Sequence, residues 1–176
     1  MEIILFRHLE TVYSKEHRIC GRIDCSIISN QQVNIPARVV SIVSNKRIVY
    51  YSSPLKRCIE SVRLLDEQLK QVITESSITI VPQLIERDWG PLSGLTKNEV
   101  LAKFNADVEN VKKRSAEIES DEKIRERVME AIKTISKDKN CVPLVATHKG
   151  CICEFARYFG MSINKVGPGD FLILNI

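Results

Sequence analysis

Residues 3–8 read Ile-Ile-Leu-Phe-Arg-His, an apolar run that ends on a cation and an imidazole. We expect this run to form a β-strand with Arg7 and His8 at its carboxyl end, the edge at which open α/β sheets bind ligands. An arginine there can bind phosphate or carboxylate in a planar, bidentate manner. The histidine beside it can act as a base, a ligand or a nucleophile, and the rest of the chain has to decide which.

The composition is typical of one globular domain. The chain has 176 residues, of which 44% are hydrophobic and 27% charged, so it can bury a core without disulfides or metals. Because it has no apolar run of about 18 residues and no secretory signal, we expect a cytoplasmic protein that does not contact membranes. The net charge of +4 is spread along the chain, which argues against nucleic-acid binding and fits a pocket for a small anion.

Six cysteines are many for a cytosolic chain: Cys20, Cys25, Cys58, Cys141, Cys151 and Cys153. Their spacings, C-x4-C and C-x-C, do not match the paired C-x2-C pattern of zinc sites, so we expect no metal centre. We expect inert thiols that behave as small buried hydrophobes. A disulfide, either Cys20–Cys25 or one that involves Cys151 or Cys153, stays open for a hyperthermophilic source.

Apolar runs and helical patterns alternate along the chain. After the first strand we expect strands at 47–52, 78–81, 141–147 and 171–174, and helices at 30–44, 53–69, 96–104, 124–135 and 151–159. Asn30, Ser53 and the Thr96-Glu99 pair provide helix caps. This order predicts one α/β domain over residues 1–176, a three-layer α/β/α sandwich with a mainly parallel central sheet. Residues of about 82–139 are expected to form a small helical cap over the site.

Three of the expected strands lead to a basic or imidazole side chain. They precede Arg7 and His8, Arg57, and His148, and in a parallel sheet such strand ends share one edge. The fixed guanidinium charges lower the pKa of His8, which leaves it as a free nucleophile. Its attack on a phosphoryl group would form a phosphohistidine, while the arginines and His148 neutralise the phosphoryl oxygens. Glu86 is the carboxyl group expected to protonate the leaving oxygen.

Four motifs occur in a fixed order: Arg-His-x-Glu-Thr at 7–11, Ser-Ser-Pro-Leu-x-Arg at 52–57, Glu-Arg-x-x-Gly-x-x-x-Gly at 86–94, and a late strand that ends on His148. Together they resemble the histidine phosphatase superfamily, including its cofactor-dependent phosphoglycerate mutase branch, over most of the chain. The resemblance implies a phosphoglycerate mutase-like fold and a reaction without a metal. It also implies the role of each site residue: His8 as nucleophile, Arg7, Arg57 and His148 as phosphate ligands, Glu86 as general acid, and Gly21 as a point where the backbone approaches the substrate.

The resemblance leaves two enzymatic functions open. Residues 86–97 are close to the corresponding mutase stretch, with Lys97 at the position of a substrate-binding lysine. Lys113 and Arg114 fall near the pair that holds the mutase substrate's carboxylate. A mutase would need 2,3-bisphosphoglycerate as cofactor and a phosphatase would need none. The chain is short beside typical mutases and has Ser14 where the family has asparagine, and a small cap makes it harder to exclude water. We therefore prefer a phosphatase that acts on a small acidic phosphorylated metabolite.

Two positions depart from the family pattern, which has glycine where this chain has Leu9 and Lys149. Leu9 could crowd the nucleophile or form an apolar wall, and Lys149 could contact phosphate or point to solvent. If both substitutions spoil the site, the protein would be a catalytically weak phosphate-binding regulatory module. The sequence is compatible with a homodimer and does not identify the natural substrate.

Overall fold

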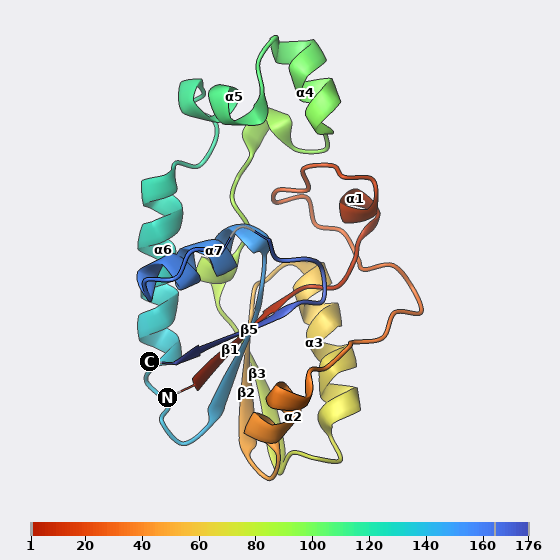
Figure 1. The fold of residues 1–176 in the computed structure, drawn as a ribbon, viewed down its shortest axis with the longest axis vertical. Helices are drawn as coiled ribbons and strands as arrows, with labels where there is room; N and C mark the ends of the chain where they lie inside the picture. The colour runs from red at the N-terminus through yellow and green to blue at the C-terminus, as the bar shows by residue number, and fades with distance from the viewer. Residues whose placement is uncertain (1, 164, 176) are drawn as a thin grey trace.

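The computed structural model describes residues 2–163 and 165–175. Its central sheet has five strands in the order β3-β2-β4-β1-β5 (Figure 1). They are β1 (Glu2–Arg7), β2 (Arg47–Ser52), β3 (Glu75–Ile80), β4 (Val142–Thr147) and β5 (Phe171–Asn175). The first four run parallel to one another, whereas β5 pairs with β1 in antiparallel orientation. The prediction of a mainly parallel sheet is confirmed, with one antiparallel edge strand.

Residues of the central strands alternate between two buried faces. In β1, Ile3 and Leu5 belong to one apolar cluster and Ile4 and Phe6 to another, and all four side chains are fully buried. Successive side chains of a strand point to opposite faces of the sheet. A sheet covered on both faces therefore needs the continuous apolar runs that this sequence contains.

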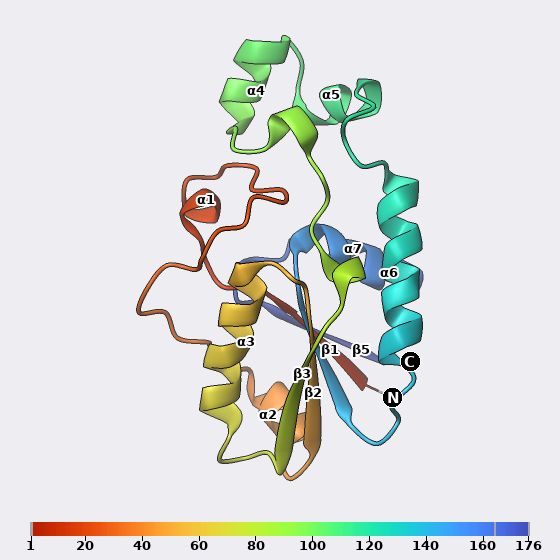
Figure 2. The same ribbon diagram turned by 180° about the vertical axis from the view of Figure 1, so that it is seen from behind.

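Helices cover both faces of the sheet, which confirms the predicted three layers. Helices α6 (Asp121–Ile135) and α7 (Lys149–Tyr158) pack on one face, and α2 (Ala37–Val43) and α3 (Lys56–Leu69) pack on the other. Figures 1 and 2 show the two helical layers from opposite sides. Among the described residues, no helix combines the length and the apolar character needed to cross a membrane.

The predicted start of the helix expected at residues 30–44 is wrong. Asn30 is not a helix cap, because it has a φ of +60° and lies in a turn. Helix α2 begins only at Ala37, directly after Pro36. Proline fixes its own φ and keeps the residue before it extended, so a helix that began at residue 30 would break at this position.

The start of α3 also differs from the prediction. The helix begins at Lys56 with Leu55 as its N-cap, not with Ser53. The Ser53 hydroxyl accepts a hydrogen bond from the Leu55 N–H at 3.3 Å and also contacts a ring nitrogen of His148 at 2.8 Å. The predicted position of Arg57 in the first helical turn is confirmed.

The first long segment, residues 9–29, contains one short helix, α1 (Val12–Lys15). Thr11 and Ser14 form its capping box: each side-chain oxygen accepts a hydrogen bond from the backbone N–H of the other, at 3.2 and 2.8 Å. A four-residue helix is too short to leave a periodic signal in the sequence. After α1 the chain lies against residues 93–96, where the Gly94 N–H donates to the Ile19 carbonyl at 2.7 Å.

Residues 89–118 form a separate unit beyond the carboxyl ends of the parallel strands (Figure 1). The chain enters this unit through the 3-10 turn η1 (Pro82–Leu84), and the unit contains η2 (Gly90–Leu92), α4 (Lys97–Phe104) and α5 (Val108–Arg114). Its members are held together by a third apolar cluster, which includes Leu92, Val100, Val111 and Ile118. We call residues 89–118 the distal unit.

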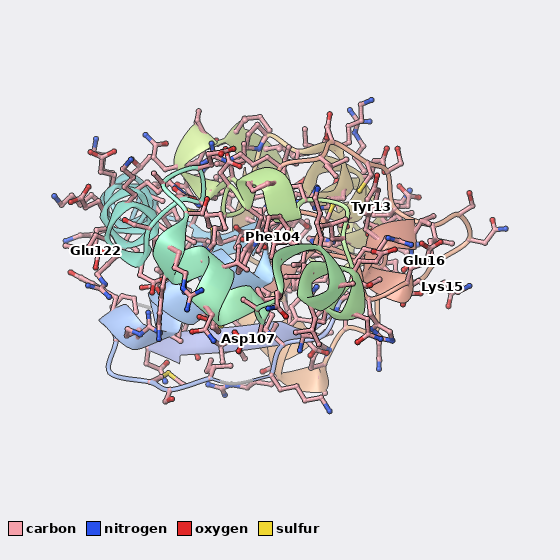
Figure 3. The ribbon with its side chains drawn as sticks, turned by 90° about the horizontal axis from the view of Figure 1, so that it is seen from above. Tyr13, Lys15, Glu16, Phe104, Asp107 and Glu122 are labelled. Atoms are coloured by element: carbon pink, nitrogen blue, oxygen red, sulfur yellow. The ribbon has the colours of Figure 1, made fainter. Side chains whose placement is uncertain are left out.

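In projection from above, the distal unit lies between α6 and α1 (Figure 3), whereas Figures 1 and 2 show that it lies beyond the ends of both. In this view, Phe104 and Asp107 lie between Glu122 of α6 on one side and, on the other, Tyr13 of α1 and its C-cap Glu16. The predicted capping box of Thr96 and Glu99 opens α4 and is confirmed. By contrast, α6 packs on the sheet through the apolar stripe that the sequence predicted.

The attachment of the distal unit yields a stability prediction. Gly90 has a φ of +47°, and a Cβ atom there would lie 2.7 Å from the Glu117 backbone oxygen, whereas Gly160 has a φ of +74° with nothing within 4 Å. Gly160→Ala should cost only the left-handed backbone strain, about 1–2 kcal/mol. Gly90→Ala should cost a further 1 kcal/mol or so, because a backbone atom cannot move aside easily. Urea unfolding of both variants measures the difference, and equal losses would contradict the packing described here.

Candidate active site

β1 and β4 lie side by side and in parallel, with Arg7 opposite Thr147. The residue after each strand is a histidine, so His8 and His148 leave the sheet together, with ring centroids 5.2 Å apart. β2 is the other neighbour of β4, and the turn after it leads to Arg57, whose Nε lies 3.3 Å from Nδ1 of His148. The structure therefore brings the three predicted strand ends together. We call Arg7, His8, Arg57 and His148 the anion cluster.

His8 is held in one neutral form. Its side chain is buried, and its Nδ1 lies 2.7 Å from the backbone oxygen of Leu9. Because a carbonyl oxygen only accepts, this contact assigns the ring proton to Nδ1 and leaves Nε2 with a free lone pair. Burial lowers the pKa of His8 to about 3, and the charges of Arg57 and Arg7 act in the same direction. His8 is therefore uncharged and nucleophilic at neutral pH.

His148 is also buried and neutral. Nδ1 accepts a hydrogen bond from Arg57 Nε, so the ring proton belongs on Nε2, which donates to the Ser53 hydroxyl at 2.8 Å. Burial lowers the pKa of His148 well below its usual value, and the proximity of His8 and Arg57 lowers it further. His148 therefore adds no charge to the cluster, and both of its ring nitrogens have hydrogen-bond partners, Arg57 and Ser53.

Arg57 is fixed by backbone oxygens of the first long segment. Its side chain is 1% exposed, Nη1 donates to the Ile23 carbonyl at 2.8 Å, and Nη2 donates to the Gly21 carbonyl at 2.8 Å. Gly21 has a φ of +55°, a conformation that glycine adopts without strain. The Gly21 carbonyl thus orients an arginine, and the approach of its backbone to the substrate stays a prediction.

Arg7 has a buried donor with no acceptor. Its Nη1 donates to the Val166 carbonyl at 2.6 Å, while its Nε is buried and has no hydrogen-bond partner among the described residues. A buried N–H of a charged group is costly to leave unpaired. An anion bound in the cluster would satisfy it.

Glu86 lies against the start of α7. A Cβ atom on Gly150 would lie 2.5 Å from Oε1 of Glu86, so glycine is needed for the carboxylate to occupy this place. The same oxygen accepts a hydrogen bond from the Arg87 N–H at 2.7 Å. Burial lowers the pKa of Arg7, and the nearby charge of Glu86 opposes that shift. The structure thus brings the predicted acid to the edge of the anion cluster.

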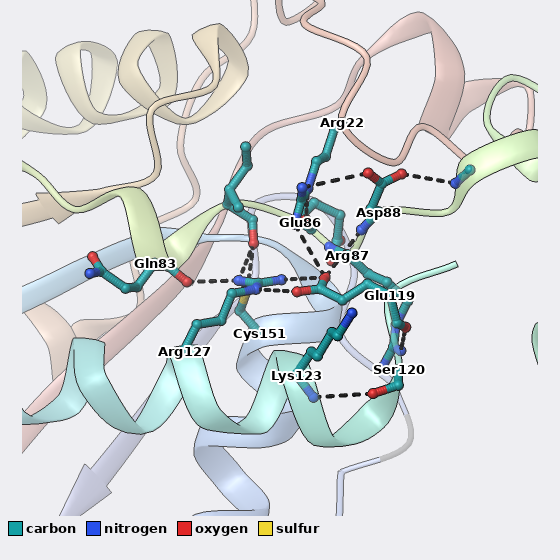
Figure 4. A network of polar contacts seen from close by, with 12 residues as sticks. Arg22, Gln83, Glu86, Arg87, Asp88, Glu119, Ser120, Lys123, Arg127 and Cys151 are labelled. Atoms are coloured by element: carbon teal, nitrogen blue, oxygen red, sulfur yellow. Dashed lines mark hydrogen bonds and ion pairs between the residues drawn. The ribbon is translucent and has the colours of Figure 1, made fainter. Parts of the chain in front are cut away.

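Arg127, which is paired with Glu119, fixes the backbone just before Glu86 through hydrogen bonds to carbonyls (Figure 4). Arg127, on α6, donates from Nη1 to the carbonyls of Gln83 at 2.7 Å and Ile85 at 2.5 Å. Its Nε and Nη2 bind the two carboxylate oxygens of Glu119 at 2.7 and 3.0 Å. The sequence analysis missed Arg127 and Glu119, because they belong to no motif and carry no signal beyond their place in a charged, helical region.

The other predicted basic residues lie outside the cluster. Lys97 is the first residue of α4, Lys113 and Arg114 end α5, and Lys149 is the first residue of α7. All four side chains are exposed, and none makes a hydrogen bond or an ion pair with another described residue. The structure thus leaves them free at the surface, with the first three on the distal unit.

The side chain of Leu9 packs into the core. Its side chain is buried in the apolar cluster shared with α2 and α3, and its N–H donates to the Ser61 hydroxyl at 2.8 Å. It also lines a surface cavity of about 510 Å³ together with Gln31, Val166 and Gly169. No member of the anion cluster is among the described residues that line this cavity, so the effect of Leu9 on the site stays a prediction.

The sequence matches a known protein family and several of its members. A family model described as the histidine phosphatase superfamily (branch 1) matches residues 3–167. The chain belongs to this superfamily. It is similar to the 2,3-bisphosphoglycerate-dependent phosphoglycerate mutase of Blochmanniella floridana, with 34% identity over 110 residues, which are 61% of this chain and 46% of the mutase. The corresponding mutase of Buchnera aphidicola subsp. Schizaphis graminum is 27% identical over 120 residues, 66% of this chain and 51% of that protein. The chain spans about half the length of these superfamily relatives.

Solved structures of phosphatases share the fold. A mycobacterial glucosyl-3-phosphoglycerate phosphatase in complex with VO3 has a TM-score of 0.77 at 20% identity, over 99% of this chain and 90% of that chain. A putative α-ribazole-5'-P phosphatase from Escherichia coli K-12 has a TM-score of 0.74 at 18% identity, over 100% and 91%. At these identities the likeness concerns the architecture of the superfamily.

The buried histidines make stability depend on pH. His8 has a pKa of about 3 in the folded protein and about 6.5 in the unfolded chain, so between these values only the unfolded chain binds the proton. Stability is complete above about pH 6.5 and falls as the pH drops toward 3, by about 1.4 kcal/mol per pH unit for each such histidine. His148 contributes with the same sign. Urea unfolding at a series of pH values from neutral to mildly acidic measures the slope.

Two variants test this assignment. His8→Asn removes one titrating group and should make the dependence shallower. His17→Asn changes an exposed histidine with a φ of +55°, which asparagine tolerates, and should leave the slope unchanged. A His8→Asn slope as steep as that of the unmodified protein would show that His8 is not buried in its neutral form.

Proposed function

We propose that this protein is a phosphomonoester phosphatase that transfers the phosphoryl group to His8 and then to water. Two observations carry the proposal: the free Nε2 lone pair of a neutral His8, and the unpaired Nε–H of Arg7, whose charge is near enough to lower the pKa of His8. A nucleophile and an anion-binding donor that share one buried cluster are the two groups that this chemistry requires. Membership in the histidine phosphatase superfamily supports the same reaction class.

In the proposed mechanism, Nε2 of His8 attacks phosphorus, and the bond from phosphorus to the leaving oxygen breaks. Glu86 in its acid form gives its proton to that oxygen and later takes a proton from the attacking water. The water breaks the N–P bond, which releases phosphate and returns the lone pair to His8. Arg7 and Arg57 neutralise the charge on the phosphoryl oxygens, and the N–H of His148 would turn from the Ser53 hydroxyl to donate to one of these oxygens.

We also propose that the distal unit is the cap over this site. This unit, residues 89–118, is shorter than the segment of about 82–139 expected from the sequence, because α6 packs on the sheet and not on the unit's own apolar cluster. Lys97, Lys113 and Arg114 lie on this cap and Lys149 at the start of α7, where their unpaired charges favour a small acidic phosphorylated metabolite.

Phosphoglycerate mutase activity is the second candidate function. The names of the curated relatives and the mutase-like residues 86–97 favour it. It would use 2,3-bisphosphoglycerate, and one phosphate of that molecule fits the unpaired Nε of Arg7. The other phosphate would need Lys97, Lys113 or Arg114, which are exposed and carry no contact to the anion cluster among the described residues. Hydrolysis needs a single phosphate site, so it remains the first proposal.

The function is tested with p-nitrophenyl phosphate. The unmodified protein should release p-nitrophenol, and His8→Ala should lower the rate by about a thousandfold or more, as expected for loss of a nucleophile. His17→Asn is the matched control and should keep full activity. Equal background release from all three proteins, with orthovanadate still bound, would identify a regulatory module instead.

The same preparation separates the two enzymes. With 3-phosphoglycerate and 2,3-bisphosphoglycerate, a phosphatase should release inorganic phosphate faster than it forms 2-phosphoglycerate. Isomerisation faster than phosphate release would replace the phosphatase proposal by the mutase.

Gly150→Ala should misplace the acid. The added methyl group would displace the Glu86 carboxylate, and general acid catalysis contributes about 100- to 10,000-fold. The loss should be larger for an alkyl phosphate than for p-nitrophenyl phosphate, because an alkoxide needs the proton more. Glu86→Gln should show the same pattern, and a Gly150→Ala variant with equal losses on both substrates would contradict it.

A further inference from the structure

Two cysteines enclose the turn that orients Arg57. The Sγ atoms of Cys20 and Cys25 lie 3.5 Å apart, and both thiols are partly exposed. The Ile23 N–H donates to the Cys20 carbonyl at 3.2 Å, which closes the turn between them. Two sulfur atoms so close, on residues that a compact turn holds together, require little movement to form a bond.

We propose that Cys20 and Cys25 are a modification site, at which a peroxide converts the two thiols to a reversible disulfide that weakens phosphate binding through Arg57. The effect on phosphate rests on the proposed function of the anion cluster. The formation of the disulfide does not.

Geometry favours Cys25 as the attacking thiol, because the Cys20 thiol has a carbonyl acceptor of its own, that of Ile23 at 3.6 Å, and therefore keeps its proton. A hydrogen bond with the Cys20 thiol is the main cause that lowers the pKa of Cys25 to about 6, and the charge of Arg57 acts in the same direction. The same hydrogen bond, together with burial, raises the pKa of Cys20. The thiolate is the reactive form of cysteine, so Cys25 reacts at neutral pH. By contrast, burial raises the pKa of Cys58 and of Cys151, whose side chains are fully buried.

The reaction balances in two steps. The Cys25 thiolate attacks one peroxide oxygen and the O–O bond breaks, which gives a sulfenic acid and, after protonation, water. The Cys20 sulfur then attacks the Cys25 sulfur, the S–O bond breaks, and the departing hydroxide leaves as water with the proton of Cys20. Two thiols and one hydrogen peroxide thus become one disulfide and two waters.

The disulfide acts on the anion cluster through two carbonyls. A sulfur–sulfur bond is about 2.05 Å long, so the sulfurs must approach by about 1.5 Å from their separation of 3.5 Å. Gly21 and Ile23 lie between the two cysteines, and their carbonyls accept the Nη hydrogen bonds of Arg57. We expect the turn to take up part of this approach, which moves the acceptors that aim the guanidinium. A small misplacement of such a group weakens binding by about tenfold or more.

The test begins with the covalent change. The full chain is treated with a small excess of hydrogen peroxide at neutral pH, the remaining thiols are alkylated, and the protein is digested with trypsin. Because Arg22 lies between the cysteines, cleavage separates residues 19–22 from 23–38, and only a Cys20–Cys25 disulfide joins these peptides. We expect the joined pair, and its loss after dithiothreitol. Recovery of both peptides unlinked would overturn the proposal.

The second part measures the effect on the cluster. Orthovanadate affinity and p-nitrophenyl phosphate turnover should each fall about tenfold on oxidation and recover with dithiothreitol. Cys20→Ser should keep its activity and no longer respond to peroxide, while Cys153→Ser, at another partly exposed thiol, should respond as the unmodified protein does.

The outcomes separate the two proposals. A disulfide that leaves vanadate affinity unchanged would overturn the link to Arg57. If neither redox form hydrolyses p-nitrophenyl phosphate faster than His8→Ala, the phosphatase proposal fails. The joined peptides and the vanadate affinity then still test the disulfide proposal.

Discussion

Backbone hydrogen bonds between β1 and β4 set the level at which His8 and His148 leave the sheet. The register pairs Arg7 with Thr147, and the His8 N–H donates to the Thr147 carbonyl at 3.1 Å, so the pairing continues one residue beyond the strands. A shift of one residue would turn every side chain of β1 to the other face. The apolar alternation of β1, buried on both faces, therefore also fixes the geometry of the site.

The anion cluster concentrates positive charge in a buried place. Arg7 and Arg57 are held by the carbonyls of Val166, Gly21 and Ile23, not by carboxylates. Backbone dipoles orient the guanidinium groups, and the charges of Glu86 and Asp170 lie near Arg7 without forming an ion pair with it among the described residues, which favours an anion. The same positive charge and burial keep both histidines neutral, so electrostatics that select the ligand also prepare the nucleophile.

Much of this arrangement could be predicted from the sequence, because strands with apolar runs and their following residues are local features. Arg7, His8, Arg57 and His148 follow from that logic. The helix start at Asn30 was predicted wrongly because Pro36 prevents a helix from running through residues 35 and 36. Arg127 acts through carbonyls of a distant segment, and the solvent exposure of Lys97 depends on how the distal unit packs; both are tertiary properties that no spacing encodes.

The position of β5 has a consequence for how the protein is made. Arg7 is synthesised before residues 142–175, yet its Nη1 donates to the Val166 carbonyl and its strand is flanked by β5 on one side and β4 on the other. Both partners come from the far end of the described chain, so closing these contacts carries the entropy of a very long loop. On the ribosome, residues 3–8 must wait as an unpaired apolar segment until residues 142–175 emerge. That wait exposes an aggregation-prone strand, and a chaperone that shields it would protect the nascent site.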